Sequence, residues 1–185
     1  VVDIMKRHFN KKISTYYISK ILVDAGIIPN YVKIQGEDFI DDYINNVIKE
    51  STIPAEADIA IEYQIPLTSK RIDFLISGID DDDKENVVII ELKQWDTAAI
   101  TNKSAVVRTR LHHGEHEVAH PSYQAWSYAE TIYNFNQTVQ DNDIILSPCA
   151  YLHNFAEETK GKEVIKNVFY KEYIDKAPAF LKNET

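Results

Sequence analysis

The chain has 185 residues, enough for one domain with a substantial core, or for one domain with an appended helical segment. Its 44% hydrophobic and 26% charged residues are typical of a soluble globular protein, and no apolar run approaches the roughly 18 to 20 residues that span a bilayer. No charged segment followed by an apolar one opens the chain, so we expect no signal peptide. The single cysteine, Cys149, excludes a disulfide within these residues and favours a cytoplasmic location.

The formal net charge of −9 argues mildly against a protein that binds phosphate groups. The charges are uneven, however: acidic residues crowd positions 80–85, which we expect to be a solvated loop. Residues 103–120 carry three basic residues and four histidines against two glutamates. Nucleic-acid binding depends on local potential more than on total charge, so the net charge decides nothing about partners.

Two amphipathic helices are predicted near the start of the chain, at 13–28 and 37–50, because apolar residues recur there on one helical face. We assign residues 1–35 to an N-terminal helical segment, either an appendage or a part of the main fold, and residues 36–185 to the main domain.

From residue 58 the hydrophobic period changes from helical to alternating. Strands are predicted at 58–65, 71–77 and 87–92, and the second is expected to close at Gly78. The third contains the run Val-Val-Ile-Ile, which indicates a strand buried on both faces at the centre of a sheet.

The remaining elements are a β-hairpin arm, a helix and a last strand. The arm is predicted at 105–111 and 115–119, the helix from Ser122 to about Val139, the strand at 143–152, and a mixture of helix and loop from Val164. This order predicts the α/β class: a mixed central β-sheet flanked by helices, with an N-terminal helical segment and a β-hairpin arm.

Two acidic residues and a lysine lie on consecutive predicted strands. Glu91 and Lys93 are two residues apart on one strand and therefore share a face, and Asp73 can lie beside them on the neighbouring strand. Two adjacent carboxylates repel each other unless a cation lies between them, and Mg²⁺ or Mn²⁺ is the natural occupant. Lys93 could then orient the attacking water and offset negative charge on phosphorus.

The ordinary explanation for such residues is a solvated pair at a strand end, and Glu-x-Lys alone is common. Placement favours a functional site here, because Glu91 and Lys93 follow four apolar residues, where charged groups are costly without a purpose.

Asp73 followed by the strand ending in Glu91-Leu92-Lys93 resembles the signature of the PD-(D/E)xK nucleases, with Ile72 in place of the usual proline. Downstream, Gln124 and Tyr128 resemble the Gln-x-x-x-Tyr motif of the RecB-like and lambda-exonuclease-like branch. The resemblance implies a restriction-endonuclease-like fold.

A closer resemblance covers about residues 58 to 180, to the amino-terminal nuclease-like region of bacterial Schlafen-like DNA/RNA helicase proteins. The matching segments begin at Glu62, Lys70, Glu91, His120 and Pro148. In those proteins a superfamily 1 ATPase follows. This chain contains no Gly-x-x-x-x-Gly-Lys-Ser/Thr loop, so it would be only the front domain of such a protein.

The resemblance implies roles for individual residues. Asp73, Glu91 and Lys93 would be catalytic, and Asp73, Glu91 and the Leu92 carbonyl would bind the metal. Gln124 and Tyr128 would contact substrate phosphate or support the metal site. The family often adds an acid from the first helix. Candidates for that acid are Glu37, Asp38 and Glu50, and the candidate substrate-binding cations are Arg71, Arg108 and Arg110.

A competing motif, His116-Glu-Val-Ala-His120, spells the zinc-protease signature. That motif works only on a helix, whereas Pro121 biases His120 away from helical geometry and Gly114 lies just before the motif. We therefore expect residues 116 to 120 to be extended, as part of a polar hairpin tip or a contact to nucleic-acid backbone.

The function predicted from the sequence is hydrolysis of phosphodiester bonds in DNA, or RNA, with Mg²⁺ or Mn²⁺ as cofactor. The partner would be a superfamily 1 helicase region of the same full-length protein, with no membrane involved. The alternative is a nucleic-acid-binding module with a degenerate nuclease site, and a zinc protease is a remote third reading.

Overall fold

The computed structural model of the chain describes residues 58–79, 82–111, 114–155 and 158–182. The helices expected at 13–28 and 37–50 and the boundary after residue 35 lie outside these residues. So do the candidate acids Glu37, Asp38 and Glu50.

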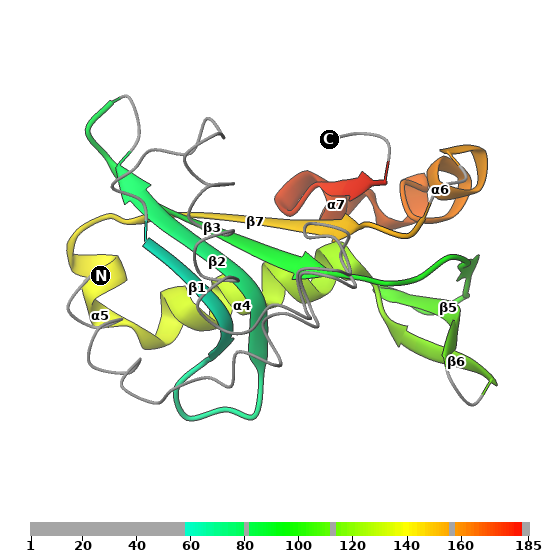
Figure 1. Cartoon of the computed structure of the whole chain (residues 1–185), viewed down its shortest axis with the longest axis horizontal. Helices are drawn as coiled ribbons and strands as arrows, with labels where there is room; N and C mark the ends of the chain where they lie inside the picture. The colour runs from blue at the N-terminus through cyan, green and yellow to red at the C-terminus, as the bar shows by residue number, and fades with distance from the viewer. Residues whose placement is uncertain (1–57, 80–81, 112–113, 156–157, 183–185) are drawn as a thin grey trace, which may run out of the picture.

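The centre of the described part is a five-stranded sheet with the strand order β1-β2-β3-β7-β8 (Figure 1). Its first three strands form an antiparallel meander: β1 (Asp58–Gln64), β2 (Arg71–Ile79) and β3 (Glu85–Leu92). β7 (Ile145–Leu152) runs parallel to β3, and β8 (Ala179–Leu181) runs parallel to β7. The prediction of a mixed central sheet is confirmed.

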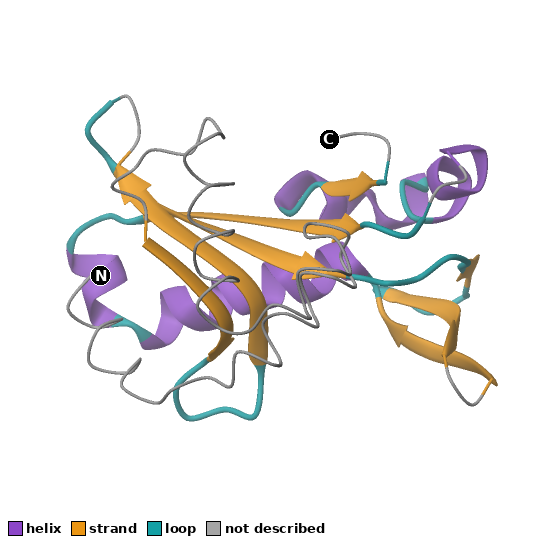
Figure 2. Ribbon diagram, in the orientation of Figure 1, coloured by secondary structure: helices purple, strands orange, loops and turns teal. Residues whose placement is uncertain are grey.

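Helices flank this sheet, as predicted. α4 (Pro121–Phe135) crosses behind it, packs on β3 and β7, and is followed by α5 (Gln137–Asp141) (Figure 2). After β7 come α6 (Glu158–Val164), a short 3₁₀ helix (Val168–Tyr170) and α7 (Lys171–Lys176), which contacts α4.

A second sheet of three strands, β4 (Ala99–Ile100), β5 (Val106–Leu111) and β6 (Gly114–Ala119), projects away from the main sheet (Figure 1). β5 and β6 pair antiparallel and confirm the predicted hairpin arm. β4 was not predicted, because a two-residue strand has too few positions to show alternation.

Two hydrophobic clusters hold the described part together. The first lies between the sheet and α4 and α5, and includes Ile72, Leu75 and Ile89, each at most 1% exposed. The second joins the base of the arm to β7, β8 and the C-terminal helices through residues such as Phe155 and Tyr170. Burial of each such side chain stabilises the fold by roughly 1.5 to 3 kcal/mol, so both ends of the sheet are firmly anchored.

Several predicted boundaries were wrong. The single helix expected from Ser122 to Val139 is two helices, because the Asn136 side chain accepts hydrogen bonds from the backbone N–H groups of Thr138 and Val139 and starts a new helix. β2 continues through Gly78 to Ile79.

Two further differences concern the sheet. β8 lies in the segment expected to be helix and loop. β3 is central, as expected, but only one of its faces is fully buried, the face that carries Val87, Ile89 and Glu91.

Candidate active site

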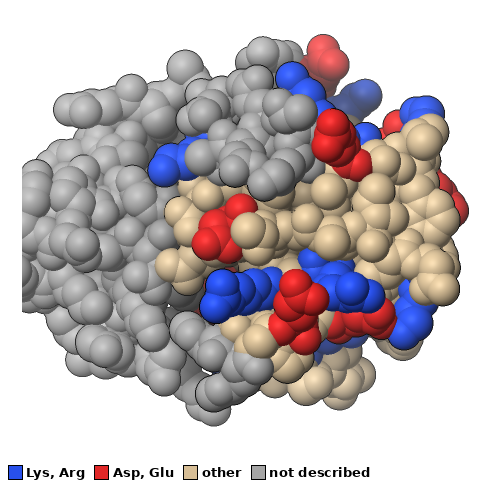
Figure 3. Space-filling view, turned by 90° about the vertical axis from the view of Figure 1, so that its right-hand side faces the viewer, with Lys and Arg blue, Asp and Glu red and all other residues tan. Residues whose placement is uncertain are grey.

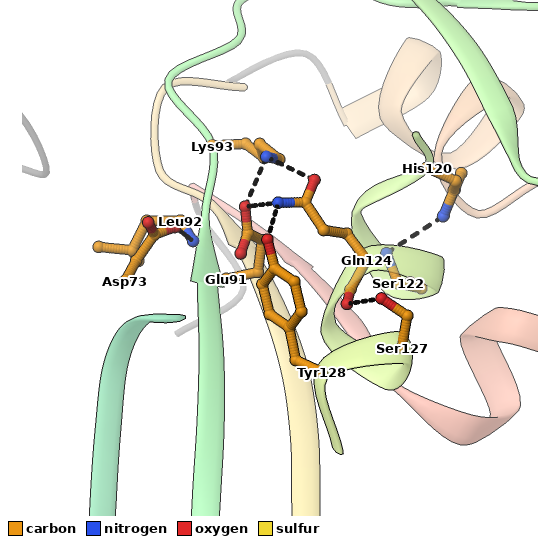
Figure 4. A network of polar contacts seen from close by, with 9 residues as sticks. All are labelled: Asp73, Glu91, Leu92, Lys93, His120, Ser122, Gln124, Ser127 and Tyr128. Atoms are coloured by element: carbon orange, nitrogen blue, oxygen red, sulfur yellow. Dashed lines mark hydrogen bonds and ion pairs between the residues drawn. The ribbon is translucent and has the colours of Figure 1, made fainter. Parts of the chain in front are cut away.

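Asp73 and Glu91 lie where β2 and β3 separate. The last pair of this ladder is Phe74 with Ile90, so a regular continuation would place Asp73 directly opposite Glu91. Instead, Oδ2 of Asp73 accepts a hydrogen bond of 2.7 Å from the backbone N–H of Leu92 (Figure 4). At the end of the strand the Asp73 side chain, rather than a backbone carbonyl of β2, thus accepts the hydrogen bond from β3.

Glu91 points from the buried face of β3 toward α4 and is 2% exposed (Figure 4). Its Oε1 accepts hydrogen bonds from Lys93 Nζ at 2.5 Å and from Gln124 Nε2 at 2.6 Å. Its Oε2 is buried and, within the part of the chain that the structure describes, no group donates a hydrogen bond to it. A buried carboxylate oxygen without a donor is costly, so this atom marks a place where something that binds oxygen fits.

Electrostatics distinguish this pair from ordinary surface acids. Burial raises the pKa of Glu91 to about 7, with the Lys93 ammonium opposing this rise and the Asp73 carboxylate adding to it. Burial likewise raises the pKa of Asp73, against the hydrogen bond from Leu92. The Asp73 and Glu91 carboxyl groups interact, so a proton or a cation bound at one of them would be favoured by the charge of the other.

α4 supplies the other side of the network. Gln124 accepts from Lys93 Nζ at 3.0 Å through Oε1, and its Nε2 also donates to the Tyr128 hydroxyl at 2.8 Å. The structure thus places Gln124 and Tyr128 at the Glu91–Lys93 end of the sheet, the direction expected from their helical spacing. Tyr128 is 7% exposed and belongs to the core as well, so its ring fixes the position of its hydroxyl.

The residues fit a hard divalent cation held by two carboxylates. A cation at Glu91 Oε2 would take the place of the missing donor and relieve the repulsion from Asp73. Among the described residues no group of three or more His, Cys, Asp or Glu could hold a metal. Mg²⁺ commonly keeps several waters and uses one or two carboxylates, which matches this donor set. The third ligand expected from the Leu92 carbonyl stays a prediction.

The three candidate substrate-binding arginines are not part of this network. Arg71 is exposed and pairs with Glu62 at 3.2 Å. Arg108 and Arg110 lie on β5 of the arm, where Arg108 approaches Glu117 at 3.6 Å. Over the described part of the face shown in Figure 3, basic and acidic side chains alternate rather than form one continuous basic patch.

The zinc-protease motif is extended, as predicted. His116 lies on β6, and His120 has extended backbone angles at the start of α4. His120 is buried, its Nδ1 accepts from the Ser122 N–H at 3.2 Å, and its Nε2 therefore carries the proton and donates to the Ile165 carbonyl at 2.9 Å. Both nitrogens are occupied, so His120 caps a helix and is not free to bind zinc.

Sequence reasoning included two neighbours of the site in the matching segments but gave them no role. Glu62 lies opposite Asp73 in the β1–β2 register, has a φ of 54°, and helps to raise the pKa of Asp73. The Lys93 ammonium lies 5.4 Å from the ring centre of Trp95. Trp95 is two residues beyond Lys93, and this spacing was a usable signal. The unusual backbone of Glu62 left no trace in the residue types.

Comparisons with known proteins find no relative of this chain. No family model, curated protein or solved structure matches the chain. Among the described residues, no helix is long and apolar enough to cross a membrane.

Proposed function

We propose that this chain is a metal-dependent nuclease domain of the PD-(D/E)xK type, with a restriction-endonuclease-like fold, that hydrolyses phosphodiester bonds in DNA or RNA. The observation that carries the proposal is the buried Oε2 of Glu91, which has no donor, beside Asp73 and within one hydrogen-bond network with Lys93. Among the described residues, the buried side-chain oxygens without a hydrogen-bond partner are Glu91 Oε2 and Ser122 Oγ, and only Glu91 Oε2 belongs to a carboxylate that interacts with a second carboxylate.

Asp73 and Glu91 would hold Mg²⁺ or Mn²⁺ at the strand ends. When bound, the ion would polarise the scissile phosphate and lower the pKa of an attached water. Lys93 would orient that water and offset the negative charge that builds up on the phosphate oxygens. Gln124 would hold the Lys93 ammonium in place through its carboxamide oxygen, because these two atoms are already 3.0 Å apart.

The wider context follows from the sequence resemblance. We propose that the domain works in the cytoplasm beside a superfamily 1 helicase region of the same full-length protein, which would deliver strands to this site. The arginines of the arm, Arg108 and Arg110, are proposed to contact the nucleic acid outside the carboxylate pair, with Arg71 nearer to it.

The test is incubation of labelled single- and double-stranded DNA and RNA with Mg²⁺ or Mn²⁺, beside an EDTA control. Asp73→Asn is the matched variant, because its amide oxygen can still accept the hydrogen bond from Leu92. We expect cleavage by the natural chain, and none with EDTA or with the variant. Binding without cleavage under every metal would instead establish the alternative, a nucleic-acid-binding module with a degenerate site.

A further inference from the structure

Lys70 has a polar environment unlike that of the other basic side chains near the site. It is exposed and directly precedes β2, three residues before Asp73. Its backbone is fixed at the base of the β1–β2 turn, where its carbonyl accepts from the Ile65 N–H at 3.0 Å and its N–H donates to the Thr68 hydroxyl at 3.1 Å. The start of the side chain is therefore rigidly placed.

The Lys70 ammonium lies 5.8 Å from the centre of the Tyr128 ring. This distance is within the range of a cation–π contact, which holds a cation over the ring without neutralising its charge. The hydroxyl of the same ring accepts from Gln124, and Gln124 donates to Glu91. Lys70 is thus one aromatic ring away from the carboxylate network.

The positive charge of Lys70 is not neutralised by a carboxylate among the described residues. Lys93 is paired with Glu91, and Arg71 is paired with Glu62. Among the described residues Lys70 has no carboxylate partner, and the contact of its ammonium is with the Tyr128 ring. A polyanion that approaches Asp73 and Glu91 is repelled by both, so a nearby lysine with no carboxylate partner in the described part of the chain would help to attract it.

We propose that Lys70 binds a backbone phosphate of the nucleic acid, next to the phosphate that Asp73 and Glu91 hold through a metal ion. Without nucleic acid, the Lys70 ammonium lies over the Tyr128 ring. The Lys70 ammonium lies one aromatic ring from the carboxylate network, and a lysine stem is long and flexible, so a phosphate that neighbours the one at Asp73 and Glu91 is the natural partner of this charge. This assignment rests on the proposed function, because it takes the carboxylate pair as the place where the strand is held.

The experiment compares the natural chain with Lys70→Gln, Lys70→Arg and a control, Lys171→Gln. Lys171 is an exposed lysine already paired with Asp175 within α7, at 2.6 Å. Affinity for a fluorescein-labelled oligonucleotide, single-stranded or duplex, is measured by anisotropy in EDTA over a series of salt concentrations. Cleavage kinetics are measured separately with Mn²⁺.

For Lys70→Gln we expect affinity to fall roughly tenfold at low salt, as for the loss of one charged hydrogen bond. The slope of log affinity against log salt should fall by about 0.7 for the single strand or about 0.9 for the duplex, the value for one phosphate contact. KM should rise with little change in kcat. Lys70→Arg should restore the affinity and the salt slope of the natural chain, and Lys171→Gln should leave affinity, salt slope and KM unchanged.

The outcomes separate the two proposals. An unchanged salt slope and affinity in a folded Lys70→Gln chain would overturn the role of Lys70, even if the natural chain cleaves well. Binding that depends on Lys70, without cleavage under any metal, would support the phosphate contact and overturn the hydrolase. Absence of binding by the natural chain to either strand would overturn both.

Discussion

Two buried polar side chains, Glu91 and His120, lie at opposite ends of the loop and arm that join β3 to α4, and their surroundings differ. Both nitrogens of His120 are hydrogen-bonded, and its ring lies 4.5 Å from that of Tyr170. Glu91 has one satisfied oxygen and one buried oxygen with no partner. The complete environment is that of a structural residue, and the incomplete one supports the proposed cation site.

The pKa shifts of the two residues follow the same division. Burial lowers the pKa of His120 to about 4, so the ring stays neutral and serves as a fixed cap. Burial raises the pKa of Glu91 to about 7, so its charge is held at a cost that a bound cation would remove. A candidate site is therefore better recognised by what its residues lack than by the motif letters alone.

The largest expected effect is on catalysis by Glu91→Gln. This change keeps the shape but removes the metal-binding charge, so cleavage should fall by at least about a thousandfold. At pH 7 the free energy of unfolding should not fall and should rise if anything, since relief of the buried charge outweighs the lost ion pair with Lys93. Cleavage assays and urea denaturation measure the two quantities. Glu115→Gln, on the exposed arm, is the control, and a Glu91→Gln chain that still cleaves normally would refute the assignment.

His120→Ala should show the reverse pattern. Loss of the helix cap, the hydrogen bond to Ile165 and the ring contact with Tyr170 should lower the free energy of unfolding by about 3 kcal/mol. Urea denaturation measures this loss. Residual cleavage per folded molecule should stay near that of the natural chain. His116→Ala, on the exposed strand β6, should change stability by no more than about 0.5 kcal/mol. Equal stability losses in both variants would contradict the structural role of His120.

The two residues should also oppose each other in the dependence of stability on pH. The pKa of Glu91 rises from 4.5 to about 7 on folding, so its contribution to stability is present below pH 4.5 and lost as pH rises to 7. The pKa of His120 falls from 6.5 to about 4, so its contribution is present above pH 6.5 and lost as pH falls to 4. The two contributions partly cancel between these values.

Glu91→Gln should therefore expose the His120 contribution. Stability of the variant should rise with pH between about 4 and 6.5 more steeply than that of the natural chain, as measured by urea denaturation at several pH values without added metal. Parallel profiles for the two chains would show that Glu91 titrates as an ordinary acid.

The smallest expected effects belong to Gln124→Ala, which removes the amide between Glu91, Lys93 and Tyr128. We expect cleavage to fall roughly tenfold, because Lys93 loses its support, with a stability change under about 1 kcal/mol. Ser127→Ala on the same helix is the matched control, since its hydroxyl reaches only the carbonyl of Gln124. If both variants cleave equally well in assays at equal folded concentration, Gln124 has no part in the site.

Several features could be predicted because they depend on neighbours in the sequence. The alternation of a strand puts Glu91 and Lys93 on one side, and the turn of a helix puts Gln124 and Tyr128 on one face. Pro121 was enough to predict that His120 is extended. The break at Asn136 could have been predicted too, because asparagine is a strong helix cap.

Other features depend on groups that only the fold brings together. The hydrogen bond from the Leu92 N–H to the Asp73 carboxylate forms because β2 and β3 stop pairing at Phe74 and Ile90. The sequence of either strand alone does not specify where that pairing stops. The acceptor for the Nε2 proton of His120 is the carbonyl of Ile165, which follows it by 45 residues. The residue types and local periods of this sequence determined which groups could act together. The tertiary structure decided which buried atoms received partners and which did not, because hydrogen bonding and desolvation depend on distances that the chain order does not contain.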